Sequence, residues 1–416
     1  MARFLVVTYK FSFMEEWKTY KLGDLVNLFS GGTPNKGRAD YWSGDIPWIS
    51  AKSMYEDFLS SSDMFITESG LRAGSKLAQK GTILLLTRGS GLFNRIPVCW
   101  TERGLAFNQD VKNIVSKDES IILNQYLFYW LYGNKTDISA ILETTGIGAG
   151  KIDTDRLLNM QINIPSISEQ KHIIRAIEPL FSKIELNKRI NHNLEEQAQA
   201  LYKSWFIDFE PFKGGKFVDS GLGLIPEGWH VGTLSEIADI TMGQSPSGSS
   251  FNEDGRGIVF YQGRTEFGFR FPLIKLFTTE PTRYAEPHSV LMSVRAPVGD
   301  INVALVKCCI GRGLAAITAK YNAYSFVLYT LKGKSSELDL YNGEGTVFGS
   351  INRKDLERLS VLIPPKSIIQ RFNDCIKPID DSIEIACKEI VSLSYSRDSL
   401  LPKLMSGQLT FDALDC

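Results

Sequence analysis

Two stretches of the chain place apolar residues at alternating steps of four and three positions, the spacing that lines one seam of a long helix. The first seam contains Ile173, Ile177, Leu180, Ile184, Asn187, Asn191, Leu194, Ala198, Leu201 and Trp205. The second lies 199 residues further on and contains Phe372, Ile376, Ile379, Ile383, Ala386, Ile390, Leu393, Arg397, Leu400 and Leu404. Neither helix could bury such a stripe alone, so the pattern predicts two long helices that pack on each other.

Both expected helices have start signals. Ser166 precedes Glu169 by three residues and Ser367 precedes Gln370 by three, each pair just after a proline, which is the spacing of a capping box. The alternative is an ordinary bundle helix that faces a globular core. The regular spacing and its duplication favour the paired helices, which would act as a rigid spacer.

Polar residues and prolines occur at defined points of the two expected helices. Asn187 and Asn191 fall on the first seam, where a polar side chain lowers stability but fixes the register of a helix pair. Pro179 and Pro378 occupy equivalent positions. Because proline removes an internal hydrogen bond, they predict a kink in each helix.

The segments that precede the two helices also repeat. At an offset of 212 residues, matching positions are Trp17 and Trp229, Leu22 and Leu234, Gly31 and Gly243, and Pro34 and Pro246. This period is too long for a solenoid and indicates a duplicated domain. The predicted fold class is therefore α+β: two tandem mixed α/β domains, each followed by a long helix, with the helices forming an antiparallel coiled-coil spacer and the whole having pseudo-two-fold symmetry.

Within the repeated segments, short β-branched runs alternate with Gly, Pro, Asn and Ser clusters. The runs at 82–87 and 289–294 are typical of strands, whereas 121–132 and 321–331 are typical of helices. The expected organisation is an upstream extension at 1–13, domains at 14–165 and 229–364, helical regions at 166–210 and 365–409, a linker at 211–228 and a tail at 410–416.

Composition excludes several classes of protein. The 416 residues carry 46 basic and 47 acidic side chains, so the chain is not a polycation that coats nucleic acid. None of the six cysteines has CxxC spacing, which favours reduced thiols and a cytoplasmic location over disulfides or a zinc site. The apolar run in residues 1–13 is too short to span a membrane.

Basic and amide side chains lie beside glycine or aromatic residues in the expected loops of both domains. Arginine can bond guanine with two hydrogen bonds, and asparagine or glutamine can do the same with adenine. The candidate DNA-binding residues are Lys36, Arg38, Lys52, Arg88, Arg95 and Asn108 in the first domain, and Gln244, Arg264, Arg270, Arg295 and Arg312 in the second. For any single arginine, a plain surface charge remains the alternative.

The candidate catalytic motifs in the sequence lack residues that their chemistry requires. Residues 146–151 resemble a phosphate-binding loop, but Thr145 replaces its first glycine and Ile152 its magnesium-binding hydroxyl residue. The four histidines lack the spacing of metal ligands. We therefore expect a binding protein that has no cofactor or metal of its own.

Several stretches together resemble the specificity subunits of type I restriction–modification systems. They are residues 17–34, 41–49, 164–170, 201–212, 223–229 and 400–409, and the resemblance extends over essentially the whole chain from Met14. It implies a non-catalytic subunit whose two domains each read half of a split, asymmetric site in double-stranded DNA. It also implies two copies of a modification subunit that methylates adenine with S-adenosylmethionine, and restriction subunits that use ATP and magnesium.

Two rival interpretations belong to other classes. A protein–protein adaptor would present two recognition domains on a rigid stalk without binding DNA. A fused nuclease or methyltransferase would need cofactor or metal motifs that we do not find in the sequence. DNA binding would weaken steeply with salt as counterions are released, and this separates it from the adaptor.

Overall fold

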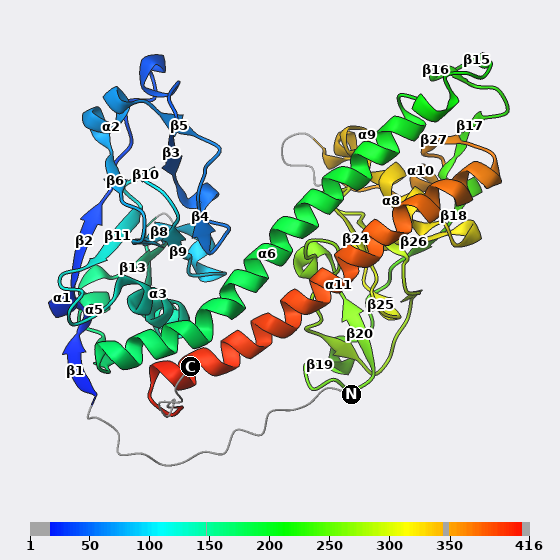
Figure 1. The fold of residues 1–416 in the computed structure, drawn as a ribbon. Helices are drawn as coiled ribbons and strands as arrows, with labels where there is room; N and C mark the ends of the chain where they lie inside the picture. The colour runs from blue at the N-terminus through cyan, green and yellow to red at the C-terminus, as the bar shows by residue number, and fades with distance from the viewer. Residues whose placement is uncertain (1–16, 147, 344–348, 410–416) are drawn as a thin grey trace. The chain divides into compact units, whose positions relative to one another are not determined.

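The computed structural model describes residues 17–146, 148–343 and 349–409 (Figure 1). The expected extension at 1–13 and tail at 410–416 lie outside the described residues. The chain forms two compact units: unit 1 contains residues 1–185 and 392–416, and unit 2 contains residues 186–391. Each unit therefore combines one globular segment with part of each long helix.

Unit 1 builds its globular part from short strands and small helices. Their bounds are β1 Lys18–Lys21, α1 Leu22–Leu25, β2 Val26–Ser30, β3 Ile46–Ile49, β4 Phe58–Leu59, β5 Phe65–Ile66, α2 Glu68–Gly74, β6 Lys76–Ala78, β7 Ile83–Leu86, β8 Arg88–Gly89, β9 Val98–Thr101, β10 Leu105–Phe107, β11 Val111–Ser116, α3 Asn124–Gly133, α4 Lys135–Ala140, β12 Leu142–Thr144, β13 Gly150–Ile152, α5 Thr154–Leu158 and β14 Gln161–Ile164. The largest sheet has the order β2-β11-β7-β9-β4, and a second sheet has the order β5-β3-β10-β6.

Unit 2 repeats this construction. Its elements are β15 Phe217–Ser220, β16 Gly223–Pro226, β17 His230–Thr233, α7 Leu234–Ile237, β18 Ala238–Met242, β19 Phe251–Asn252, β20 Ile258–Tyr261, β21 Phe277–Thr278, β22 Tyr284–Ala285, β23 Val290–Ser293, β24 Ile301–Val303, β25 Cys308–Ile310, β26 Leu314–Ala319, α8 Tyr324–Lys332, α9 Ser335–Asp339, α10 Arg353–Glu357 and β27 Ser360–Ile363. One of its sheets has the order β18-β26-β23-β24, the counterpart of β2-β11-β7-β9, and a second sheet has the order β19-β21-β20-β25-β22.

Pairings outside the main sheets confirm the duplication. The first strand of each globular part pairs antiparallel with its last, β1 with β14 and β17 with β27. One parallel pair also recurs, β10 with β3 in unit 1 and β25 with β20 in unit 2. Leu22 and Leu234, matched in the sequence, each begin the short helix after the first strand and are fully buried.

One apolar helix anchors each core. In α3 six consecutive residues from Tyr126 to Leu131 are buried, and in α8 seven from Ser325 to Leu331. Burying a large apolar side chain stabilises a fold by about 1.5–3 kcal/mol, so these helices contribute much of the cohesion of their units. The predicted helices at 121–132 and 321–331 are thus confirmed, although each begins three residues later than the apolar run.

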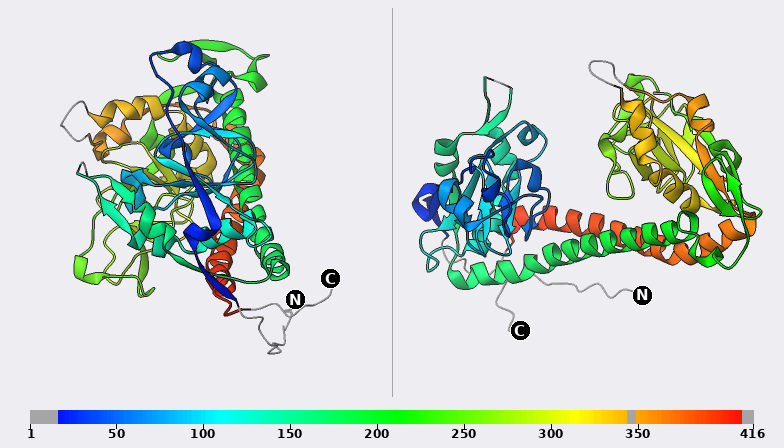
Figure 2. Two further views of the ribbon diagram at one scale, coloured as in Figure 1. Left: turned by 90° about the vertical axis from the view of Figure 1, so that its left-hand side faces the viewer. Right: turned by 90° about the horizontal axis from the view of Figure 1, so that it is seen from above.

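The two long helices are α6, Ile167–Phe206, and α11, Lys366–Met405 (Figures 1 and 2). In unit 2 Asn187 Nδ2 donates to Glu389 Oε2 at 2.8 Å and Asn191 Nδ2 to Cys387 Sγ at 3.3 Å. The rings of Trp205 and Phe372 lie 5.6 Å apart. Partner numbers fall along α11 as they rise along α6, so the helices are antiparallel, and both asparagines occupy the seam as predicted.

Most of the predicted seam is buried or half-buried, with one correction at its end. The seam residues Ile173, Ile177, Ile184, Ile376 and Ile383 are buried, and Leu180, Leu194, Leu201, Ile379, Ile390 and Leu393 are half-buried. Leu400, however, is 39% exposed, whereas its neighbour Leu401 is 1% exposed and packs in the core of unit 1. A strict heptad drifts by about 20° per repeat on a straight helix, which moves the buried face by one residue.

Of the two predicted helix caps, the one at Ser166 is present and the one at Ser367 is not. Ser166 Oγ accepts a hydrogen bond from Glu169 N at 3.4 Å, as expected for a cap. At α11, Ile369 N donates to Pro365 O. The helix begins at Lys366, two residues earlier than a cap at Ser367 predicts, and Ser367 lies inside its first turn. Both helices continue through Pro179 and Pro378 as single helices.

Candidate nucleic-acid interface

In unit 2, loops that follow four strands of the two sheets meet at one place. Gly243 N donates to Leu314 O at 2.9 Å, and Gln244 N donates to Ile310 O at 2.9 Å. These bonds bring the end of β18 to the turn between β25 and β26. Gly311 N, in that turn, donates to Tyr261 O at 2.8 Å, which adds the end of β20.

The end of β23 joins the same group. Val294 N donates to Gly313 O at 2.9 Å, which places Arg295 beside the β25–β26 turn. Arg295 then forms an isolated antiparallel bridge with Ser350. We call this set of strand ends loop cluster 2; its exposed polar side chains are Gln244, Gln262, Arg264, Arg295 and Arg312.

Glycines make this close approach possible. A Cβ at Gly243 would lie 2.1 Å from Gly311 O, and one at Gly311 would lie 2.8 Å from Gln262 O. Any side chain at either position would clash with backbone. The loops can therefore approach one another this closely only because glycine occupies these positions. The residues between the glycines direct their side chains to solvent.

Unit 1 has the corresponding arrangement, which we call loop cluster 1. Gly32 N donates to Phe107 O at 2.9 Å, Asn108 N to Ile49 O at 3.0 Å, and Thr87 N to Asp110 O at 2.8 Å. These bonds join the ends of β2, β3, β7 and β10, the counterparts of β18, β20, β23 and β25. The residue after Thr87 is Arg88, which pairs with Lys151 of β13 as Arg295 does with Ser350.

The two clusters share a backbone plan but carry different side chains. Lys52 in the turn after β3 corresponds to Arg264 in the turn after β20. In the next loop Gln109, whose Oε1 accepts from Thr33 Oγ1 at 2.7 Å, corresponds to Arg312. Only Arg88 and Arg295 present the same residue type. The clusters are therefore suited to bind different chemical patterns.

Unit 1 also carries basic residues near Arg88 that the sequence did not single out. Lys112 lies on β11, and its Nζ donates to Ser30 Oγ at 2.5 Å. Burial lowers the pKa of Lys112, and the positive charges of Arg88 and Lys76 lower it further. Asp110 acts in the opposite direction, so three cations and one carboxylate lie near one another, and their net positive charge suits an anion. The alternation of buried and exposed residues along β11 could have predicted that Lys112 faces outward. Its proximity to Arg88 could not be predicted, because it depends on the tertiary fold.

Two further candidates of unit 1 lie on the long connection between β2 and β3. Lys36 and Arg38 are exposed. Arg38 Nη2 lies 2.8 Å from Asp40 Oδ2, and its guanidinium stacks on Tyr41 at 4.8 Å from the ring centre. The hydrogen bond from Arg38 lowers the pKa of Asp40. Arg38 therefore has an acidic partner that DNA would have to replace.

The structure assigns other roles to Arg95 and Asn108. Arg95 is exposed, but its guanidinium donates to the carbonyl oxygens of Tyr55 at 2.7 Å and Met54 at 3.0 Å, so it ties down a loop. Asn108 is buried, and its Oδ1 accepts from Asp110 N at 3.1 Å in the turn of loop cluster 1. Its side chain shapes the turn, and the exposed neighbour Gln109 is the residue that faces solvent.

Arg270 requires a correction. Its side chain is 2% exposed and lies against Asp380 and Glu195 of the long helices. A guanidinium that is enclosed by two carboxylates cannot reach a base edge, so this placement contradicts a direct contact with DNA. Local sequence shows an arginine between two phenylalanines and gives no sign of carboxylates that lie 75 and 110 residues away.

Among the described residues, no three His, Cys, Asp or Glu side chains are placed to hold a metal ion. None of the described helices has the length and apolar character needed to cross a membrane. The glycine-rich stretch 146–151 runs from the β12–β13 connection into β13, where Lys151 pairs with Arg88, and its residue 147 lies outside the described set.

Comparison with known proteins follows the same duplication. The model for the type I restriction modification DNA specificity domain matches residues 14–196 and 226–394. The type I restriction enzyme MjaIX specificity subunit of Methanocaldococcus jannaschii is 29% identical over 422 aligned positions, which cover 96% of this chain and 95% of that protein. The EcoR124I/EcoR124II specificity subunit of Escherichia coli is 32% identical over 192 positions, 46% of each chain.

A solved structure shows the same fold. The type I restriction–modification S subunit from M. genitalium superimposes with a TM-score of 0.57 at 17% identity, over 94% of this chain and 96% of that one.

Proposed function

This chain belongs to the family of type I restriction–modification DNA specificity proteins, and we propose from this premise that its two loop clusters each read one half of a split DNA site. The protein recognises DNA sequence and directs modification by partner subunits. The observation that carries the assignment of the site is the repetition of one glycine-packed backbone plan with different exposed side chains. Two readers of this kind favour an asymmetric site.

The side chains of the two clusters divide the work of recognition. Arg264, Arg295 and Arg312 of cluster 2 can each bond guanine through two donors, worth about 1–3 kcal/mol of discrimination against a wrong base. Gln244 and, in cluster 1, Gln109 have the amide needed for adenine. The cations around Arg88 are suited to phosphate, which positions the protein without reading sequence.

Existing ion pairs do not oppose this role. Arg264 pairs with Asp300, and both side chains are substantially exposed. An exposed pair is worth about 0.2–1 kcal/mol, so a phosphate or guanine can replace the carboxylate at small cost. The balanced net charge of −1 is compatible with binding because only the local charge of each cluster meets DNA.

The partners are proposed from the exposed faces of the long helices. Leu186 and Ile190 of α6 and Ile385 of α11 are large apolar residues that face solvent in unit 2. Such positions are typical of protein contacts. We place two copies of the modification subunit on these helices, with restriction subunits joining them; Arg175, Lys183, Lys188 and Gln199 remain candidate polar contacts. S-adenosylmethionine, ATP and magnesium would be bound by those partners, and this chain would supply no catalytic residue.

The test is adenine-methylation mapping in a methylation-free host that expresses the chain with its modification subunit. The expected result is a split, asymmetric motif with a fixed spacer. Arg295→Ala and Arg264→Ala should alter the bases methylated in one half only, and Arg95→Ala, outside the clusters, should leave both halves unchanged.

A stable complex that methylates no new sequence would contradict the proposal and favour the protein–protein adaptor. Salt dependence provides the matching measurement in vitro. DNA affinity should fall steeply between 50 and 200 mM salt, by roughly a hundredfold or more if several phosphates are neutralised. An affinity for partners that does not depend on DNA or salt is the adaptor's signature.

A further inference from the structure

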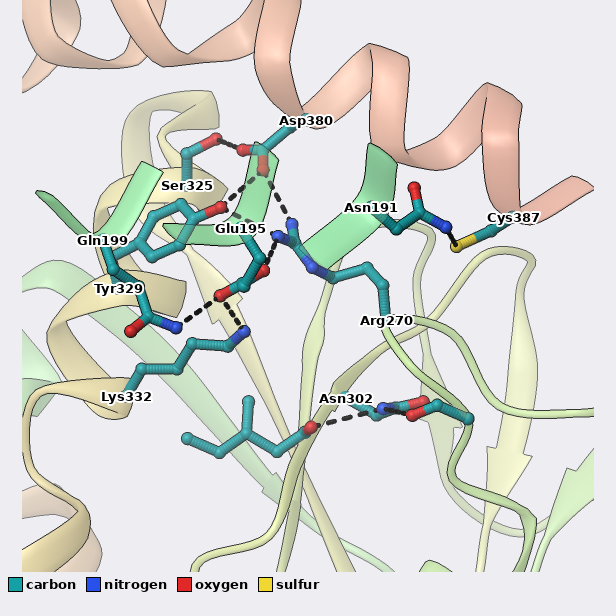
Figure 3. A network of polar contacts seen from close by, with 12 residues as sticks. Asn191, Glu195, Gln199, Arg270, Asn302, Ser325, Tyr329, Lys332, Asp380 and Cys387 are labelled. Atoms are coloured by element: carbon teal, nitrogen blue, oxygen red, sulfur yellow. Dashed lines mark hydrogen bonds and ion pairs between the residues drawn. The ribbon is translucent and has the colours of Figure 1, made fainter. Parts of the chain in front are cut away.

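A buried cluster of charged side chains attaches the globular part of unit 2 to both long helices (Figure 3). Arg270 Nη1 donates to Asp380 Oδ1 of α11 at 2.7 Å, and Nη2 donates to Glu195 of α6. Nη2 also donates to Tyr329 Oη of α8 at 2.8 Å. One guanidinium therefore joins three helices. We call the set Arg270, Glu195, Asp380, Tyr329, Lys332 and Ser325 the Arg270 cluster.

The remaining members complete the charge balance. Lys332 of α8 donates to Glu195 Oε1, and Ser325 Oγ of the same helix donates to Asp380 Oδ2 at 2.5 Å. Two cations thus face two carboxylates. Burial opposes ionisation of Glu195, but Arg270 and Lys332 outweigh it and lower its pKa to about 2. Glu195 is therefore ionised at neutral pH, and both carboxylates have fixed hydrogen-bond partners.

The backbone of Arg270 belongs to the loop that carries a candidate reader. Val303 N of β24 donates to Arg270 O at 2.9 Å, and Asn302 Nδ2 donates to Gly268 O at 2.9 Å. The same loop begins at Arg264, which pairs with Asp300 just before β24. The position of Arg264 is therefore linked through this loop to the carboxylates on the long helices.

The chemistry of the cluster restricts how the globular part sits on its helices. Apolar contacts tolerate small rotations, whereas a planar guanidinium bonded to two carboxylates and a phenol satisfies its partners in a narrow range of orientations. A rotation of α8 against α6 and α11 would leave buried charges without partners, which is strongly unfavourable. The cluster consequently favours a single angle.

Resting on the proposed function, we propose that Arg270 is a positioning residue that sets the spacing between half-sites at which DNA is methylated. The guanidinium holds the second recognition segment at a fixed angle on α6 and α11. Loop cluster 2 then meets its bases at a defined number of base pairs from the first half-site. The identity of the bases read does not depend on Arg270.

The main test uses a variant without charges: Arg270→Met, Lys332→Met, Glu195→Gln and Asp380→Asn together. Removing one partner alone would leave a buried charge and threaten folding, whereas removing all four keeps the amides available to Ser325 and Tyr329. The complete complex with its modification subunit is assayed on duplexes that carry both half-sites at the native spacer and at spacers one base pair shorter or longer.

We expect the wild-type complex to methylate the native spacer, and the charge-free variant to lose about tenfold or more of its preference over the altered spacers, with the same bases methylated. Ile317→Val is the matched control, because it loosens the core of unit 2 on β26 without touching the cluster. It should keep the spacing preference.

Two results would overturn the proposal. One is a folded charge-free variant that retains the wild-type spacing preference. The other is an unchanged preference in Arg270→Lys, which keeps the charge but cannot bond three partners in a planar fork. Failure of the proposed function has a different signature, since the wild-type complex would then methylate no split duplex at any spacing.

Discussion

Glu195 shows how one side chain can link the long helices to the recognition segment. It is the only member of the Arg270 cluster that accepts from both cations, Arg270 and Lys332. Its folded pKa of about 2 lies below its ordinary 4.5, so the unfolded chain binds a proton more readily. Its contribution to stability is therefore present above about pH 4.5 and is lost as the pH falls towards 2.

Glu195→Gln should remove this contribution. We expect the variant to have a lower melting temperature than wild type at pH 7, because Arg270 and Lys332 lose a carboxylate. The difference should narrow as the pH is lowered from 4.5 towards 2, because in this range Glu195 takes up a proton in the unfolded chain while it stays ionised in the folded one. Calorimetry of the full chain between pH 3 and 7 measures this difference in melting temperature, and Glu227→Gln, at an exposed position, is the control. A difference between variant and wild type that does not change with pH would show that the charge of Glu195 is not stabilising.

A second titration belongs to unit 1. Burial lowers the pKa of Lys135 to about 8, with Asp57 opposing the shift and Arg95 adding to it. Because the unfolded chain holds this proton up to its ordinary value of 10.5, stability should rise with pH between about 8 and 10.5. Lys135→Met should flatten that rise in the unfolding free energy. A rise of equal slope in the variant would assign it to another group.

The long helices show what local pattern can predict about an element. Heptad spacing depends only on neighbours along the chain, so the seam, its asparagines and its antiparallel pairing could be inferred from the sequence. The end of α11 could not, because there the buried face is set by the core of unit 1. Leu401 packs against Gly133 of α3, whereas the heptad had placed its neighbour Leu400 on the buried seam between the two long helices.

These adjacent leucines provide a matched test at the level of the helix. Leu401→Ala should lower the unfolding free energy by about 2–5 kcal/mol, because it removes a buried side chain and leaves a cavity. Leu400→Ala should lower it by clearly less than Leu401→Ala does, since Leu400 is already 39% exposed in the folded chain. Urea unfolding of the full chain measures both. Equal losses would place the heptad seam at Leu400 after all.

The short strands lie beyond this kind of prediction. β7 and β23 could be recognised from their β-branched runs, whereas β4, β5, β19, β21 and β22 have two residues each, too few to show a period. Such strands exist because a partner is present: β4 pairs with β9, which lies some 40 residues later. The start of α3 was predicted three residues too early for a related reason. Ile122 is apolar because it is buried in the core, although it lies before the helix begins.

At the scale of the whole molecule, the sequence reveals the duplication but not the site. Arg264, Arg295, Arg312 and Gln244 could be chosen for their chemistry. Their convergence, however, depends on backbone hydrogen bonds between residues far apart in the chain, such as Gly243 and Leu314. For the same reason, the sequence did not indicate Lys112 as a site residue and wrongly suggested that Arg270 contacts DNA. Arginine beside aromatic residues looks alike in a loop that faces DNA and in one that is buried against distant carboxylates.

We expect the Arg270 cluster to limit which recognition segments can be exchanged between relatives. In unit 1 the polarity is reversed: Arg397 of α11 provides the cation, 3.8 Å from Asp57 of the globular part, and stacks on Tyr132 at 4.9 Å. In unit 2 the helices provide the carboxylates instead. A segment that replaces residues 229–364 must therefore supply an arginine to Glu195 and Asp380.

A chimera with such a donor should change the second half of the methylated motif and leave the first half and the spacer intact. A donor without the arginine leaves two buried carboxylates unpaired, so we expect poor folding until Glu195→Gln and Asp380→Asn are introduced with it. Methylation mapping of the chimeras with and without these substitutions decides the matter. If both halves change, the segments do not read independently, and if the donor without arginine works unaided, the cluster does not govern exchange.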